Sequence, residues 1–168
     1  MEIKKVPCKG LSTEEYDKAL KVDWQPELAY AWDNGIGIGA YLAALKEGKI
    51  LAAKCDGCGR IMLPARAFCE LCFRPTDGYV AVHDTGVVNT FAVSHVNWDA
   101  SRLKEKDPRH LPAVIEIDGA SKGQGILHIL GNVKPGDVKI GMKVRAVWKP
   151  AGERTGSITD ILFFEPVK

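Results

Sequence analysis

Apolar residues recur along this chain with two different spacings, and the change between them divides the sequence. In the first 48 residues the clearest run is helical, with one stripe at i, i+3, i+4 and i+7 formed by Ile38, Tyr41, Leu42 and Leu45. Gly48 follows where a helix terminator is expected. From residue 79 onward, short apolar runs alternate with turn residues, which is typical of an antiparallel β domain. The pattern predicts an α+β fold.

The N-terminal region carries further helix signals. Ser12 can cap a helix while Glu15 reaches back to it, and the pattern predicts a helix from there to about Val22. A second short helix is expected over Pro26–Trp32, because proline suits a first helical turn. The glycine-rich stretch Asn34–Gly39 is predicted to be a hinge, since no strand precedes it as a dinucleotide-binding loop requires.

Five apolar runs in the second half are the predicted strands of one barrel: Gly86–Val96, Ala113–Ile117, Gly125–Leu130, Lys143–Trp148 and Ile158–Phe164. A shorter run, Tyr79–Val82, is expected to lead into the first of them. Turn residues separate the strands, as at Asp118–Gly119 and Lys134–Asp137. Five antiparallel strands that close on themselves are typical of an OB-fold barrel.

The chemistry of the sequence is concentrated in two Cys-x-x-Cys pairs, Cys55 with Cys58 and Cys69 with Cys72. Four thiolates can close a tetrahedral shell around zinc, which takes sulfur ligands at about 2.3 Å and then has no open position for a substrate. The ten residues between the pairs are fewer than the roughly 15–20 of many four-cysteine fingers. The spacing therefore predicts a compact ribbon around a structural zinc ion, with a strand at Lys49–Lys54 leading into it.

Two alternatives to zinc remain open at this stage. Two disulfides are disfavoured by a cytosolic redox poise. Rubredoxin-like iron is conceivable because Cys55-x-x-Cys58-Gly59 has the form of a rubredoxin knuckle, but the second knuckle lacks the matching Pro and Gly. The fifth cysteine, Cys8, stands near the terminus with no histidine beside it and is interpreted as a spectator thiol.

These elements predict three regions. An N-terminal helical arm covers residues 1–48, a rubredoxin-like zinc ribbon with four cysteines covers 49–78, and a five-stranded antiparallel OB-fold domain covers 79–168.

Composition narrows the possible partners. The chain has 168 residues, of which 46% are hydrophobic and 26% charged, and a formal net charge of +2. A net charge this small does not indicate binding to nucleic acid or to an anionic membrane. No apolar run has the length of a membrane span, and the residues after Met1–Lys5 do not form a signal-type segment. We expect a cytoplasmic protein.

Two groups of residues are candidates for partner or ligand contacts. The arm carries Trp24 and Trp32, which a small β domain would cover incompletely; they pack either on the chain's own ribbon or on a partner. The long connection after the first barrel strand carries Trp98, Arg102 and Arg109, which suit an anionic ligand or a partner, unless the segment is simply a solvated loop. No arrangement of residues indicates a catalytic site.

The ordered combination of motifs resembles the zinc-ribbon OB-fold family of acyl-CoA-associated proteins. It consists of Lys49–Leu51, the cysteine motif with Gly59, Pro64 and Arg66 inside it, Thr85–Phe91, Leu111–Ile117 and Ile140–Val144. Members of this family are small non-catalytic partners of thiolases, ketoacyl-CoA synthases or related aldolases. The resemblance implies that the four paired cysteines are the zinc ligands, and that barrel or arm meets a thiolase-type catalytic chain near its CoA channel.

Within that family, the N-terminal arm is most similar to the small subunit of two-component thiolases of anaerobic aromatic degradation, such as benzoylsuccinyl-CoA thiolase. The expected function is therefore to scaffold the catalytic chain and help enclose a CoA thioester, with phosphate contacts from Arg66, Arg102 or Arg109. The glycine-rich Asn34–Gly39 stretch and the long loop over residues 97–110 depart from the family pattern. The alternatives are a nucleic-acid-binding zinc-ribbon OB module and an iron electron carrier.

Overall fold

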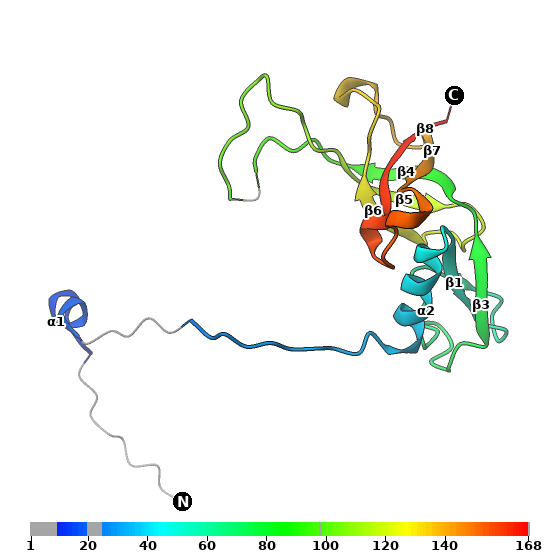
Figure 1. Ribbon diagram of the computed structural model, residues 1–168, viewed down its shortest axis with the longest axis horizontal. Helices are drawn as coiled ribbons and strands as arrows, with labels where there is room; N and C mark the ends of the chain where they lie inside the picture. The colour runs from blue at the N-terminus through cyan, green and yellow to red at the C-terminus, as the bar shows by residue number, and fades with distance from the viewer. Residues whose placement is uncertain (1–9, 20–24, 98, 168) are drawn as a thin grey trace, which may run out of the picture. The chain divides into compact units, whose positions relative to one another are not determined.

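The computed structural model describes residues 10–19, 25–97 and 99–167 (Figure 1). The chain forms two units, Met1–Trp32 and Asp33–Lys168. Two of the residues singled out above, Trp24 and Trp98, and also Cys8, lie outside the described residues.

The described residues of the first unit contain one short helix, α1 (Thr13–Lys18). The predicted capping box is confirmed: the Glu15 N–H donates to Ser12 Oγ at 3.2 Å, and the Ser12 N–H donates to Glu15 Oε2 at 2.7 Å. The helix is shorter than predicted, because Ala19 already has extended backbone angles; the expected end, Val22, lies outside the described residues. A six-residue helix that buries no side chain has little to extend it.

Two predictions about the next segment are wrong. Residues 26–32 form no helix, since none of them buries a side chain that could stabilise one. The glycines of the expected hinge lie inside helix α2 (Gly35–Lys46). Gly37 explains this, because a Cβ there would lie 2.8 Å from the Arg66 Cα. The glycine therefore permits close packing of the helix on the ribbon.

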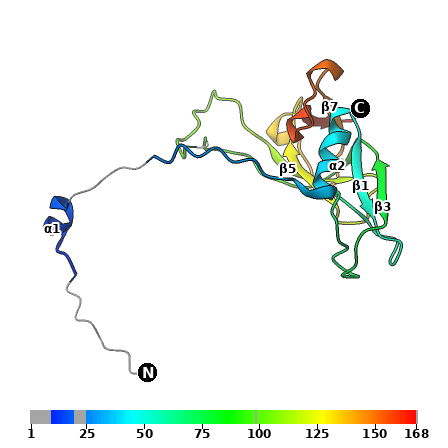
Figure 2. The same cartoon turned by 60° about the horizontal axis from the view of Figure 1, so that its bottom comes forward.

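Helix α2 packs its predicted face on the strand that follows it (Figure 2). Tyr41 and Leu45 are 3% and 0% exposed, whereas Leu42 is half-buried and Ile38 remains 38% exposed. Gly48 ends the helix as predicted, with a φ of +76° and its N–H donating to the Leu45 carbonyl at 2.9 Å. Among the described residues, no helix has both the length and the apolar character needed to cross a bilayer.

A three-stranded sheet in the order β2-β1-β3 follows the helix. Its strands are β1 (Ile50–Lys54), β2 (Ile61–Met62) and β3 (Gly78–Val82). Strand β3 pairs antiparallel with β1 along its whole length, from Ile50 opposite Val82 to Lys54 opposite Gly78. The run at Tyr79–Val82 thus precedes the barrel in sequence, as expected, but its partner strand belongs to the ribbon.

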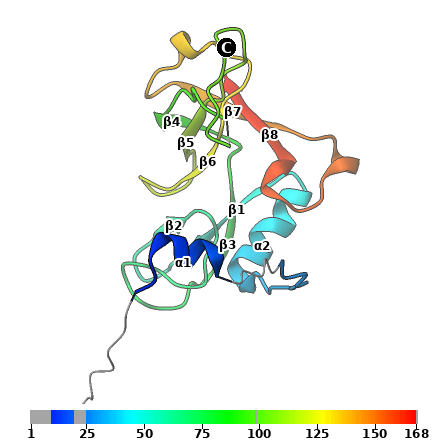
Figure 3. The same cartoon turned by 90° about the vertical axis from the view of Figure 1, so that its left-hand side faces the viewer.

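The five predicted barrel strands are present in a second sheet, ordered β6-β5-β4-β7-β8. They are β4 (Thr85–Phe91), β5 (Pro112–Ile117), β6 (Gly125–Ile129), β7 (Lys143–Trp148) and β8 (Ile161–Pro166). A bridge between Leu130 and Phe164, with the Gly131 N–H donating to the Phe164 carbonyl at 2.9 Å, closes the sheet into a barrel. Figure 3 shows these strands gathered on one side of α2 and the ribbon.

Two strand ends differ from the prediction. The first barrel strand ends at Phe91 and not at Val96. The last strand begins only at Ile161, because Ile158–Asp160 forms a 3-10 helix, η3. The buried Asp160 carboxylate accepts hydrogen bonds from the Thr155, Gly156 and Ser157 N–H groups and so fixes this turn. Two further 3-10 helices, η1 (Pro135–Asp137) and η2 (Ala151–Glu153), lie in connections.

The ribbon and the barrel share one hydrophobic core, which runs from Leu45 and Ile50 through Met62 to Ile115 and Phe164. Hydrogen bonds support the contact. The Ile61 N–H donates to Ser121 Oγ at 2.9 Å, and the Leu63 N–H donates to Gln124 Oε1 at 3.2 Å. The ribbon is thus fixed directly to the loop between β5 and β6.

Candidate metal centre

The two cysteine pairs lie in two turns with the same backbone hydrogen bonds. In the turn between β1 and β2, the Cys55 N–H donates to the Arg60 carbonyl at 2.9 Å, and the Gly59 N–H donates to the Cys55 carbonyl at 2.8 Å. The turn between β2 and β3 repeats this pattern, with distances of 2.9 Å from Cys69 N to Arg74 O and from Phe73 N to Cys69 O. Each turn therefore presents two sulfurs on one side, as a zinc knuckle does.

The four sulfurs are arranged as a tetrahedral ion requires. All of them lie within 4.8 Å of one another, and the Sγ atoms of Cys58 and Cys69 are 3.6 Å apart. Zinc–sulfur bonds of about 2.3 Å in a tetrahedron place the sulfurs roughly 3.8 Å apart. None of these four cysteines forms a disulfide. The donor set fits zinc, and with four protein ligands it has no position left for a substrate.

The hydrogen bonds of the knuckles shift the pKa values of two of the cysteine thiols in opposite directions. The Cys72 N–H, helped by that of Leu71, lowers the pKa of the Cys69 thiol to about 7. The hydrogen bond between the Cys72 thiol and the Cys58 sulfur raises the pKa of Cys72 to about 12. A divalent metal ion bound to the four sulfurs stabilises their thiolate forms.

Of the residues expected to contact CoA or a partner, the structure places Arg66 on the ribbon. Its Nη1 lies 3.5 Å from Glu70 Oε2, and Glu70 also pairs with Arg60 at 2.8 Å. Arg102 and Arg109 lie on the connection between β4 and β5, where Arg102 bridges to Val96 through the backbone. Trp32 belongs to the first unit and is 82% exposed, with its ring 5.9 Å from that of Tyr30.

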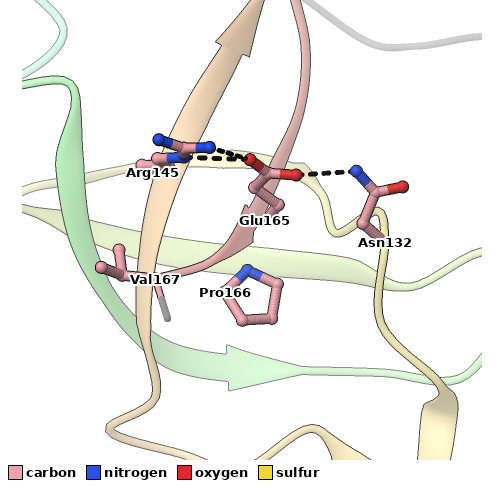
Figure 4. A pocket seen from close by; sticks show the side chains of 5 residues that line it. All are labelled: Asn132, Arg145, Glu165, Pro166 and Val167. Carbon is pink, nitrogen blue, oxygen red and sulfur yellow. Dashed lines mark hydrogen bonds and ion pairs between the residues drawn. The ribbon is translucent and has the colours of Figure 1, made fainter.

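A hollow on the barrel was not predicted from the sequence. It has a volume of about 570 Å³ and is lined by Asn132, Arg145, Glu165, Pro166 and Val167 (Figure 4). Arg145 Nε and Nη2 donate to Glu165 Oε1 at 2.9 and 2.7 Å, and Asn132 Nδ2 donates to Glu165 Oε2 at 2.7 Å. The guanidinium is thus neutralised, so the hollow is not an anion site as it stands. Only the pairing of β7 with β8 brings Arg145 opposite Glu165.

Comparison with known proteins supports both domains. Residues 42–77 match the rubredoxin-like zinc ribbon domain of ChsH2, and residues 79–149 match the C-terminal OB-fold domain of ChsH2. A DUF35 domain-containing scaffold protein of Methanocaldococcus jannaschii is 32% identical over 122 residues, which are 71% of this chain and 82% of that protein. The predicted zinc ribbon and OB fold are confirmed. The matching family model describes a zinc ribbon, which favours zinc over the iron alternative.

Two solved structures share the fold. A DUF35 family protein of unknown function from Sulfolobus solfataricus aligns with a TM-score of 0.58 and 23% identity, over 80% of this chain and 85% of that one. A chain of the Ltp2-ChsH2(DUF35) aldolase aligns with a TM-score of 0.57 and 19% identity, over 84% of this chain and 98% of that one. At these identities the likeness concerns the fold alone.

Proposed function

This chain belongs to the DUF35 family of zinc-ribbon and OB-fold proteins, and on that premise we propose that it is a non-catalytic scaffold subunit of a thiolase-type enzyme. The four-cysteine centre supports a structural role, because a closed tetrahedral shell offers no site for chemistry. The similar M. jannaschii protein is described as a scaffold, and a structural neighbour is part of an aldolase assembly.

The observation that carries the proposal is the exposure of the N-terminal segment. All described residues from 10 to 19 and from 25 to 36 are exposed. They include Leu28, Tyr30 and Trp32, at 58, 69 and 82%. Burying one such side chain contributes about 1.5–3 kcal/mol, and aromatic residues are enriched where protein surfaces meet. This exposure within the N-terminal segment supports the proposal that the segment binds a partner.

The proposed reaction belongs to the partner chain. In the thiolytic direction, a cysteine thiolate of that chain attacks the β-carbonyl of a β-ketoacyl-CoA, the Cα–Cβ bond breaks, and the α-carbon takes a proton as the shortened acyl-CoA leaves. The thiolate of coenzyme A then takes the acyl group from the cysteine, which is released again as a thiolate. The resemblance of the N-terminal arm favours benzoylsuccinyl-CoA as the substrate. We place the barrel beside the CoA thioester, with Arg66, Arg102 or Arg109 near its phosphates, and the whole assembly in the cytoplasm.

Reconstitution tests this proposal. The thiolase-type chain of the same host is purified alone and together with this chain, and thiolysis of a β-ketoacyl-CoA is measured by loss of CoA thiol. We expect activity to depend on this chain and to fall when Trp32 is replaced by Ala. Ile140→Ala is the matched control, because Ile140 is 71% exposed but lies on the barrel unit. Full activity of the catalytic chain alone, with no stable complex, would overturn the proposal.

A further inference from the structure

The two zinc knuckles differ at one equivalent position. Gly59 follows the first pair of cysteines with a φ of +71°, and Phe73 follows the second pair with a φ of +50°. In both turns this residue donates its N–H to the carbonyl of the first cysteine of the pair, at 2.8 and 2.9 Å. Glycine adopts this left-handed conformation freely, whereas a bulky residue with a Cβ is strained in it. The backbone of the second knuckle therefore favours glycine over phenylalanine.

Contacts within the ribbon do not offset that strain. Phe73 is 88% exposed, and two apolar neighbours on the same turn, Phe68 and Leu71, are 60 and 62% exposed. We call these three residues the knuckle face. Single exposed apolar residues are common, but three within six residues of one turn, one of them in a strained conformation, favour a binding role for this turn.

The charged side chains nearest the knuckle face in sequence form ion pairs. Arg66 and Arg60 share Glu70, at 3.5 and 2.8 Å, and Arg74 Nη2 lies 2.9 Å from Asp77 Oδ1. These three arginines and two carboxylates leave one positive charge in excess. Recognition of anionic lipid surfaces uses clusters of about 4–8 Lys and Arg residues, so a single excess charge favours a protein surface that is apolar and carries an acidic side chain at its edge.

We propose that the knuckle face docks the ribbon onto the catalytic chain, with Phe73 inserted into an apolar pocket of that chain that has an acidic side chain at its edge. This inference rests on the proposed scaffold function. The metal holds the turn in place, so the three side chains are presented without a large loss of conformational freedom on binding. Aromatic residues that fill a pocket in this way carry a large share of the binding energy in many complexes.

The substitution Phe73→Gly in the full-length chain tests whether the knuckle face binds the catalytic chain without disturbing the fold. The variant gives the second knuckle the glycine of the first, so we expect zinc content and thermal stability to be kept or improved. The affinity for the catalytic chain isolated with the wild-type protein should fall about tenfold or more, measured by biolayer interferometry. Leu127→Ala is the matched control, because Leu127 is 70% exposed on the barrel and should bind like wild type.

The outcomes distinguish the two proposals. If wild type and Phe73→Gly bind the catalytic chain equally, the knuckle face is not the docking surface, while the scaffold function stands. If wild type binds no thiolase-type chain, the scaffold function fails and this inference fails with it. Binding of wild type, but not of Phe73→Gly, to phosphatidylcholine vesicles in place of the catalytic chain would overturn the protein-docking assignment in favour of a lipid surface.

Discussion

The two units of the chain differ in whether their apolar side chains are buried. In Asp33–Lys168, helix α2, ribbon and barrel bury Leu45, Ile50, Ile115 and Phe164 in one continuous core. In the first unit no described residue is buried, and α1 has a capping box at its N-terminus but buries no side chain. Stability thus resides in the second unit, where burial and metal ligation act together. The apolar side chains of the first unit stay exposed, so they are available to bind a partner.

The largest expected effect comes from removing the metal. Structural zinc contributes on the order of 10–16 kcal/mol of apparent binding free energy in small zinc domains, so Cys58→Ala or chelation should unfold the ribbon. Hydrogen exchange should then rise across β1 and β3 while α1 is unchanged. A Cys58→Ala protein that keeps zinc and still assembles with a partner would contradict the structural role of the centre.

The next largest effect is the loss of unfolding free energy when an apolar side chain is truncated, which should differ between the two units. Leu45 is fully buried, and Leu45→Ala should lower the free energy of unfolding by about 2–5 kcal/mol in urea. Leu28→Ala, at a position 58% exposed in the first unit, should change it by less than about 0.5 kcal/mol. Equal effects of the two substitutions would show that the first unit is packed in solution.

Two glycine-to-alanine substitutions in α2 should change the stability by smaller amounts and in opposite directions. A Cβ at Gly37 would lie 2.8 Å from the Arg66 Cα, so Gly37→Ala should cost about 1–3 kcal/mol by forcing helix and ribbon apart. Gly39 has no atom within 4 Å of such a Cβ, and Gly39→Ala should stabilise the helix by roughly 0.5–1 kcal/mol. Thermal unfolding of both variants tests this. A neutral Gly37→Ala would mean that the close contact is absent.

The smallest effect concerns the acid sensitivity of α1. The backbone N–H of Ser12 holds the pKa of Glu15 below its usual value. A lowered pKa in the folded state means that this interaction stabilises α1 above the ordinary glutamate pKa and is lost as the pH falls through the lowered one. Carbonyl resonances of Glu15 and helical shifts of α1 should therefore titrate together at acidic pH, and Glu15→Gln, which removes the titrating carboxyl, should abolish this titration of α1 while leaving the barrel unchanged.

The features that could be predicted from the sequence are those encoded by near neighbours. The spacing of the cysteines defines two knuckles, Ser12 and Glu15 define a capping box, and Gly48 ends α2 because each signal involves residues a few positions apart. Alternating apolar runs likewise gave the five barrel strands, since period-two burial is local.

The features that were missed depend on residues far apart in the chain. The glycines after Asn34 suggested a hinge because glycine weakens helices, but Gly37 is needed for a contact with Arg66, which the sequence does not reveal. The Pro26–Trp32 helix had suitable residues but no surface to pack against. The hollow beside Arg145 and Glu165 depends on the register of β7 with β8.

Native mass spectrometry of the protein purified from its own host at low salt, with metal analysis of the same sample, tests the central claim most directly. The account predicts a complex that contains a thiolase-type chain, identified by its peptides, and a zinc ion on each copy of this chain. A zinc-loaded monomer that never associates with such a chain would contradict the scaffold function.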